Sequence, residues 1–235
     1  MKITHIVDKL KELDCPVESL ALGDFDQIGE LTAKKSRRPD NPLYKSAGCF
    51  FRPNYERGML IYALIRKFNV KSYLEIGFGR GYSAVCAAMA LDALGDPNGK
   101  VTTVDVNMDQ NHLQNVARAF PQQWMSRINF VHGKSQEVLQ TLDKFDMIYI
   151  DGDHTYDGVK RDWELCRDKW NKVMLFDDYH MPTKTQTDIE CAKLIDQIED
   201  PTKELIILDR RIFFDDRRMS DDQIDYGQVL MTRSF

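Results

Sequence analysis

From residue 56 onward, the chain alternates between segments with helical periodicity and short apolar runs that are typical of buried strands. Strands separated by helices usually pair in parallel, because each crossover helix returns the chain to the same end of the sheet. The pattern predicts an α/β fold with a doubly wound, Rossmann-like sheet and helices on both faces. The five apolar runs are residues 72–77, 101–106, 128–133, 145–151 and 173–178.

The two ends of the chain depart from this alternation. Near the C-terminus, the runs "KELIILDRRIFFDD" and "GQVLMTRSF" have no helical pattern between them, which predicts a strand and an antiparallel partner at one edge of the sheet. Residues 1–55 show no strand pattern and include a polar, proline-bearing stretch. We therefore expect an N-terminal helical extension or lid over residues 1–55, followed by the main domain over residues 56–235.

Composition narrows the function classes. The net charge of -5 and pI near 5.6 give no overall attraction to nucleic acid. The basic loop "AKKSRRP" (33–39) could still contact an anionic partner, so this alternative stays open. The five cysteines never form a CxxC pair, which disfavours a disulfide framework or zinc site and predicts a reducing, cytoplasmic location. We expect no signal peptide and no membrane span, because no apolar run is long enough.

The stretch "YLEIGFGRGYSA" places Gly77, Gly79 and Gly81 directly between the first strand and its helix. Open α/β sheets bind ligands at the carboxyl ends of their strands, and glycine lets the backbone approach a ligand closely. The dinucleotide fingerprint G-x-G-x-x-G would require a glycine at position 82, which is Tyr82 here. The loop therefore predicts a nucleoside ligand other than a dinucleotide.

Two acids beside this loop indicate which ligand it binds. Glu75 lies two residues before the first glycine, where it suits a ligand that carries positive charge. Asp105 ends the second strand, where an acid accepts hydrogen bonds from ribose hydroxyls. A ribose without a pyrophosphate, together with a cation, predicts S-adenosylmethionine as the cofactor.

Three further carboxylates, Asp151, Asp177 and Asp178, stand at the ends of the fourth and fifth strands. Neighbouring strands lie about 4.8 Å apart, so these acids can converge on one point. Converging carboxylates repel each other unless a cation lies between them, and oxygen ligands favour Mg²⁺ first, with Ca²⁺ or Mn²⁺ as alternatives. The competing interpretation is helix capping, but two consecutive acids cannot both cap one helix.

Residues 56–180 resemble the class I S-adenosylmethionine-dependent methyltransferases, through "EIGFGRG" as their first motif and the acid of "VTTVDVN" as their second. The resemblance implies a seven-stranded, mostly parallel sheet with an antiparallel last strand. It implies that Glu75, Gly77 and Gly79 line the methionine moiety and that Asp105 binds the ribose. It also implies, on a looser match, that Gly133 and Ser135 flank the adenine.

The wording "IDGDHTYDGVKRD…FDDYH" is similar to the metal-dependent O-methyltransferases, nearest their macrocin-like and cephalosporin-hydroxylase-like branch. In that resemblance, the metal ligands are Asp151, Asp177 and Asp178. The catechol type has a lysine base three residues after its first metal acid, and this position is His154 here. His154 or Asp151 would accept the proton of the hydroxyl, and Asp153 would either orient His154 or reach the metal through water. A solvent-facing His154 at a helix start is the alternative to its role as a base.

The sequence thus predicts a methyltransferase that methylates a hydroxyl group of a small molecule with the help of a divalent metal. Two alternatives stay open: a metal-independent methyltransferase for a nitrogen or nucleic-acid acceptor, and a cofactor-binding module without catalysis. An N-terminal extension often pairs subunits, so a homo-oligomer is also open.

Overall fold

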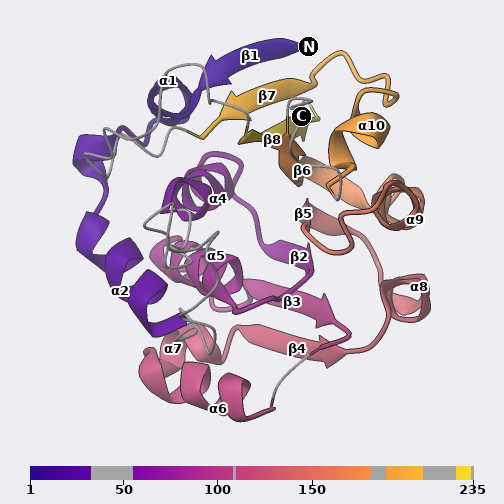
Figure 1. Ribbon diagram of the computed structural model, residues 1–235. Coiled ribbons are helices and arrows are strands. Elements are labelled where there is room, and N and C mark those ends of the chain that lie inside the picture. Colours follow the sequence, from indigo (N-terminus) through magenta and orange to yellow (C-terminus); the bar gives the residue numbers. More distant parts are fainter. Residues whose placement is uncertain (33–54, 108–109, 181–188, 209–225, 234–235) are drawn as a thin grey trace, which may run out of the picture.

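The computed structural model describes residues 1–32, 55–107, 110–180, 189–208 and 226–233. Its centre is a sheet of eight strands in the order β1-β7-β8-β6-β5-β2-β3-β4 (Figure 1). The strands are β1 (Lys2–His5), β2 (Ser72–Ile76), β3 (Lys100–Asp105), β4 (Ile128–His132), β5 (Phe145–Ile150), β6 (Trp170–His180), β7 (Glu204–Ile207) and β8 (Tyr226–Thr232). The five predicted βα strands are confirmed as β2 to β6.

All strand pairs in this sheet are parallel except those of β8, which runs antiparallel to both β6 and β7. This confirms the α/β Rossmann-like class and the antiparallel last strand. The strand order reverses at β2, which pairs with β3 on one side and with β5 on the other. Ligands of such sheets bind at this switch point, so the carboxyl ends of β2 and β5 are the expected location of the site.

The predicted count of seven strands, and the expected absence of a strand in residues 1–55, were wrong. Strand β1 adds an eighth strand, parallel to β7, at the sheet edge. Strand β1 has four residues, and Thr4 is the one that is buried. The sequence of this strand therefore lacks the alternation of apolar and polar residues by which a strand is recognised. A long-range contact holds it instead: Glu204 of β7 accepts a hydrogen bond from Thr4 and pairs with Lys9 at 2.6 Å.

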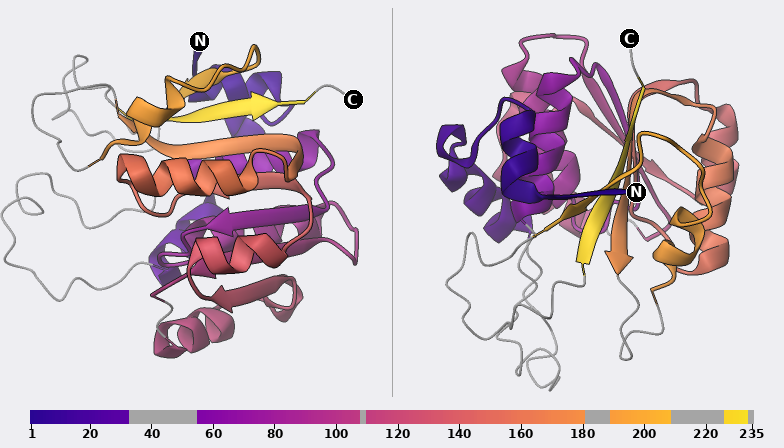
Figure 2. Two further views of the ribbon diagram at one scale, coloured as in Figure 1. Left: turned by 90° about the vertical axis from the view of Figure 1, so that its right-hand side faces the viewer. Right: turned by 90° about the horizontal axis from the view of Figure 1, so that it is seen from above.

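Two layers of helices cover the sheet, one on each face, as predicted (Figure 2). One hydrophobic cluster joins the sheet to the first layer, and a second cluster joins it to the other layer. The first layer holds α1 (Ile6–Glu12), α2 (Leu22–Thr32), α4 (Tyr55–Lys67), α5 (Tyr82–Ala93), α6 (Gln110–Ala119) and α7 (Gln122–Met125). The second holds α8 (Ser135–Val138), α9 (Tyr156–Cys166) and α10 (Cys191–Ile195).

In the sequence, Val159, Trp163, Cys166 and Trp170 repeat at helical spacing, which predicts one helix that continues to Trp170. Helix α9 instead ends at Cys166, and Trp170 begins β6. The sheet takes this residue because Trp170 pairs with Phe145 in register, and the Arg233 guanidinium stacks 4.1 Å from the centre of its ring.

The described part of the N-terminal extension packs into the main core. Ile6, Leu10, Phe25 and Ile28 of α1 and α2 are buried in the same cluster as α4 and α5. The basic loop at 33–39 and the rest of the extension up to residue 54 lie outside the described residues, and the predicted lid role stays a prediction. Within the described residues, no helix is long and apolar enough to cross a membrane.

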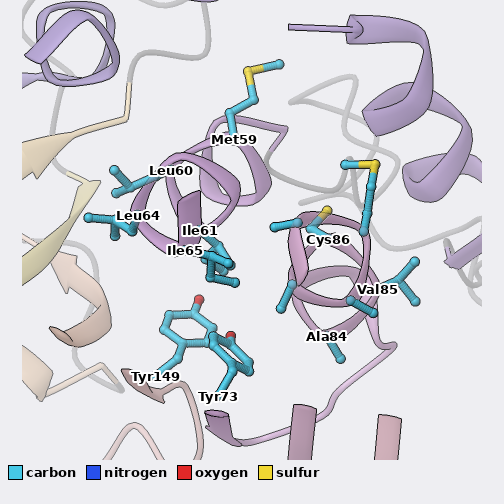
Figure 3. Close-up of a cluster of buried hydrophobic side chains, with 14 of the residues drawn as sticks. Met59, Leu60, Ile61, Leu64, Ile65, Tyr73, Ala84, Val85, Cys86 and Tyr149 are labelled. Atoms are coloured by element: carbon cyan, nitrogen blue, oxygen red, sulfur yellow. The ribbon is translucent and has the colours of Figure 1, made fainter. Parts of the chain in front are cut away.

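Helix α4 lies over β2 and β5 with its apolar stripe against the sheet (Figure 3). Ile61 and Ile65 are fully buried and point toward the rings of Tyr73 and Tyr149, which belong to the two strands. A buried side chain of this size contributes about 1.5–3 kcal/mol to folding. This packing fixes the first turn of α4 beside the switch point.

Candidate active site

The three predicted acids meet at the carboxyl ends of β5 and β6. Asp151 directly follows β5, while Asp177 and Asp178 lie within β6. Consecutive strand residues normally point to opposite faces, but the pairing of β6 with β8 shifts register between Phe176 and Tyr179, and Asp178 has a φ of 50°. This irregularity turns both acids toward Asp151, and backbone of this kind is often found at functional sites.

His154 joins two of these acids. Its Nε2 lies 3.5 Å from Asp151 Oδ1, and its Nδ1 lies 3.2 Å from Asp178 Oδ2. One ligand atom from each of Asp151, His154 and Asp178 can be chosen so that all three atoms lie within 4.8 Å of one another. Two carboxylates and an imidazole fit a divalent cation, and the nitrogen donor widens the choice from Mg²⁺ to Mn²⁺, Fe²⁺ or Zn²⁺. Sequence reasoning predicted two members of this set as ligands and assigned His154 a different role.

Asp177, the remaining predicted ligand, lies behind this set and is only 2% exposed. It forms an ion pair with Arg57 Nη2 and accepts a hydrogen bond from Gln228 Nε2 at 3.1 Å. Burial raises the pKa of Asp177, and the Arg57 guanidinium opposes that rise. In this arrangement Asp177 supports the cluster from beneath.

Arg57, in the first turn of α4, was missed by the sequence reasoning. Its Nη1 lies 3.4 Å from Asp151 Oδ2, and its Nη2 lies 4.0 Å from Asp178 Oδ1 in addition to pairing with Asp177. The side chain is 19% exposed. One signal was available: Arg57 precedes Gly58 in a helix otherwise recognised by its apolar stripe. Gly58 marks a close approach, because a Cβ there would lie 2.5 Å from the Tyr82 hydroxyl.

Two buried polar side chains behind the acids were also missed. Tyr149 donates a hydrogen bond to Asp151 Oδ2 at 3.3 Å, and Gln228 Nε2 of β8 donates to the Tyr149 hydroxyl at 3.2 Å. Gln228 also bonds Asp177, so a single residue of the last strand orients acids from both β5 and β6. In sequence, Tyr149 looked like part of an apolar run, and Gln228 lay in a strand that had no assigned role.

The protonation state of His154 bears on its predicted role as a base. The hydrogen bond with Asp151 raises the pKa of His154 to about 9; burial opposes this rise, and the charge of Asp178 adds to it. His154 is therefore protonated at neutral pH in the metal-free protein, which disfavours a base role there. Its part in catalysis stays a prediction.

Asp153 has a local partner of its own. Its Oδ1 accepts hydrogen bonds from the backbone N–H and hydroxyl of Thr155, at 3.1 and 2.8 Å. Thr155 in turn caps α9 by accepting a hydrogen bond from the Gly158 N–H at 3.1 Å. These contacts order the start of α9 next to His154, and the predicted roles of Asp153 stay predictions.

The glycine loop lies against the acid cluster. Gly77 has a φ of +94°, and a Cβ there would come within 1.9 Å of the carbonyl oxygen of Asp151. At Gly79, by contrast, no atom of the described residues other than its two chain neighbours lies within 4 Å of the Cβ position, so the described part of the chain leaves this side of the backbone open. Asp105 accepts a hydrogen bond from the Gly79 N–H at 3.0 Å. Exposed loop backbone beside a half-buried acid fits the ribose and methionine parts of S-adenosylmethionine.

Glu75 lies beneath this loop. It is fully buried and accepts hydrogen bonds from Ser83, in the first turn of α5, and from Thr103 of β3 at 2.8 Å. Burial raises its pKa to about 8, which these two donors oppose. Glu75 therefore joins the loop, the helix and the neighbouring strand. Its predicted contact with the methionine moiety stays a prediction.

The two residues predicted to flank the adenine lie after β4. The Gly133 N–H donates to the backbone carbonyl of Asp105 at 3.0 Å, which places this turn next to the ribose acid. The Ser135 hydroxyl donates to Asp162 Oδ1 of α9 at 2.5 Å, and Asp162 is only 1% exposed. Ser135 thus ties the turn to α9, and its adenine contact is untested.

Comparison with known proteins agrees with this geometry. Residues 74–179 match the family model of a methyltransferase domain. The matched segment contains the glycine loop, Asp105 and the three acids, while Arg57 and Gln228 lie outside it. A Mycobacterium sp. (strain JLS) protein, named provisionally as an O-methyltransferase, is 31% identical over 100 residues, which is 41% of this chain. That alignment covers 43% of the mycobacterial protein, so the chain spans less than half of this curated relative.

Solved methyltransferase structures share the fold over nearly the whole chain. The O-methyltransferase of Bacillus cereus, solved in complex with S-adenosylhomocysteine, aligns over 97% of this chain and 96% of its own with a TM-score of 0.55. TomG of Streptomyces achromogenes, an O-methyltransferase involved in tomaymycin synthesis that was solved with S-adenosylmethionine, aligns over 92% and 100% with a TM-score of 0.58. The identities are 17% and 14%, so these likenesses show the fold alone.

Proposed function

We propose that this protein is an S-adenosylmethionine-dependent methyltransferase that methylates a hydroxyl group of a small molecule with the help of a divalent cation. The observation that carries the proposal is the contact between the glycine loop and the cluster of Asp151, His154 and Asp178. Gly77 lies directly against the backbone of Asp151, so a cofactor held by the loop would present its methyl group beside the cluster. The methyltransferase-domain match over both parts supports this assignment.

Within this proposal, the residues of the chain mainly position the reactants. Methyl transfer from a sulfonium is an in-line displacement, so alignment of the acceptor oxygen with the methyl group supplies much of the rate. The loop backbone and Asp105 would hold the cofactor, and Asp151, His154 and Asp178 would hold the cation. A divalent cation there would lower the pKa of the acceptor hydroxyl. Both predicted bases, His154 and Asp151, belong to the set that would hold the cation, so the proposal keeps both as the proton acceptor.

The motif "IDGDHTYDGVKRD…FDDYH" resembles the macrocin-like and cephalosporin-hydroxylase-like branch, and we keep this branch as part of the proposal. Mg²⁺ is our first choice of metal, with Mn²⁺ next because of the imidazole. The acceptor class follows from the O-methyltransferase names of the mycobacterial relative and of TomG.

Calorimetry with S-adenosylmethionine, with and without Mg²⁺ or Mn²⁺, tests the assignment. We expect cofactor binding in either case, and methyl transfer to a panel of small-molecule hydroxyls only when metal is present. EDTA should abolish turnover and leave cofactor binding intact. Absence of cofactor binding would remove the assignment itself.

One observation favours a second candidate, a methyltransferase that needs no metal. Arg57 already places a positive charge beside all three carboxylates. Full activity in EDTA would select this candidate and remove the metal from the proposal.

A further inference from the structure

We infer that Arg57 is an internal counter-ion that holds the acid cluster in shape without metal and competes with a divalent cation for it. This inference rests on the metal site of the proposed function. It assigns a role to a residue that lies outside the segment matched by the methyltransferase-domain model.

The geometry places His154 on one side of the cluster and the Arg57 guanidinium on the other. Asp151 faces His154 with Oδ1 and Arg57 with Oδ2. Asp178 likewise faces His154 with Oδ2 and Arg57 with Oδ1, the latter at 4.0 Å. The two carboxylates that would bind the metal are thus shared between His154 above and Arg57 below.

The third acid keeps Arg57 in place. Asp177 pairs with Arg57 Nη2 and is almost fully buried, so separating the pair would leave an unpaired charge in the core. Gly58 allows α4 to approach α5 closely next to this residue, and the buried Leu60 and Ile61 fix the same turn of the helix. The guanidinium therefore cannot move far when another cation arrives.

The electrostatic consequence follows from these distances. A guanidinium stays charged at every accessible pH, so Arg57 compensates the carboxylates permanently. A divalent cation held by Asp151 and Asp178 would lie within several ångströms of this charge and be repelled by it. With an effective dielectric constant of about 20 and a separation of about 6 Å, the bare repulsion corresponds to a factor of about 10,000 in metal affinity. The carboxylates around Arg57 compensate most of its charge, so we expect at least about tenfold of this weakening to remain. The site would bind metal reversibly and fill only when the cation is abundant.

Calorimetric titration with Mn²⁺ tests the inference on wild type, Arg57→Gln and Arg57→Lys. We expect Arg57→Gln to bind Mn²⁺ about tenfold more tightly than wild type, because the competing charge is gone. Arg57→Lys keeps the charge and should bind nearly as weakly as wild type. Arg66→Gln is the matched control: it removes a charge from the exposed end of the same helix, where Arg66 donates to Tyr62, and should change nothing.

Thermal unfolding provides a second measurement. In EDTA, Arg57→Gln should melt well below wild type, because Asp177 loses its ion-pair partner and Asp151 and Asp178 lose a nearby positive charge. Saturating Mn²⁺ should compensate Asp151 and Asp178 and raise the melting temperature part of the way back. Wild type should respond much less to Mn²⁺. An Arg57→Gln protein that binds Mn²⁺ no better than wild type, or that stays unfolded in saturating Mn²⁺, overturns the inference.

Cofactor calorimetry on the same proteins separates this failure from failure of the proposed function. Wild type that binds S-adenosylmethionine, alongside an Arg57→Gln variant with unchanged Mn²⁺ affinity, removes only the counter-ion role. Wild type that does not bind the cofactor removes the methyltransferase assignment, whatever the metal titration shows.

Discussion

The cofactor side and the acid side of the switch point are built in different ways. The cofactor side consists of consecutive backbone between β2 and α5, with one acid, Asp105, at the end of the next strand. The acid side combines side chains from α4, β5, β6, β8 and the loop before α9. Local backbone conformation shapes the first, and long-range polar contacts shape the second. The two sides should therefore respond to mutation in different ways.

The largest effect is expected where the two sides touch. Gly77→Ala would place a Cβ about 1.9 Å from the Asp151 carbonyl, in backbone with positive φ. We expect a loss of about 5 kcal/mol in the free energy of unfolding, enough to unfold a marginally stable protein. Denaturant titration measures this loss.

Gly79→Ala is the matched control, because its Cβ would meet open space. It should cost only about 1 kcal/mol in stability while weakening S-adenosylmethionine binding, since the new methyl group occupies the proposed cofactor side. Equal destabilisation by the two variants would contradict the contact described here.

On the acid side, Asp151→Asn should separate chemistry from cofactor binding. The variant keeps the shape of the side chain but loses its charge, so we expect methyl transfer to fall by about 1,000-fold. Affinity for S-adenosylmethionine should stay within about twofold of wild type. Steady-state kinetics and calorimetry together make the measurement. If cofactor affinity fell as much as the rate of methyl transfer, Asp151 would contribute to cofactor binding as well, and the separation of the two sides would be wrong.

The pH dependence of the free energy of unfolding tests the role of Glu75, the buried acid beneath the glycine loop. Burial raises the pKa of Glu75 to about 8, so the folded state binds a proton there that the unfolded state releases near pH 4.5. Stability from this group is therefore complete at low pH and is lost as pH rises toward 8. Between pH 5 and pH 8, the free energy of unfolding of wild type should fall because Glu75 must stay buried while it loses its proton. Glu75→Gln should make this fall smaller by about 3 kcal/mol. Chemical denaturation of both proteins at pH 5 and pH 8 measures this difference. If the free energy of unfolding depends on pH equally in the two proteins, Glu75 is not the cause of the pH dependence.

The smallest effect is expected at Gln228, which touches the acids from behind. Gln228→Leu removes the donor shared by Tyr149 and Asp177, and we expect kcat to fall by about tenfold with the KM for S-adenosylmethionine unchanged. Kinetics over a range of cofactor concentrations distinguishes the two parameters. A change in KM alone would show that Gln228 affects cofactor binding and not the chemistry at the acids.

The contrast between the two sides also explains what sequence reasoning could find. Strands β2 to β6 and the glycine loop were predicted because periodicity and glycine spacing are local signals. Strand β1 was missed because its pairing depends on Glu204, some 200 residues away. Arg57 and Gln228 were missed for the same reason, since their partners lie in distant strands. The acids at 151 and 178 were predicted to meet because adjacent strands end at one edge, but the place of His154 between them needed the structure.

The contact between Gly77 and the Asp151 carbonyl also constrains how such a protein can diversify. At Gly77 and the Asp151 carbonyl, a larger side chain or an insertion would push the two loops apart, so this contact cannot be used to change the acceptor. New acceptors would have to be recognised by other parts of the chain. For engineering, this pair of loops should be kept as a unit, and libraries for new substrates should be built elsewhere.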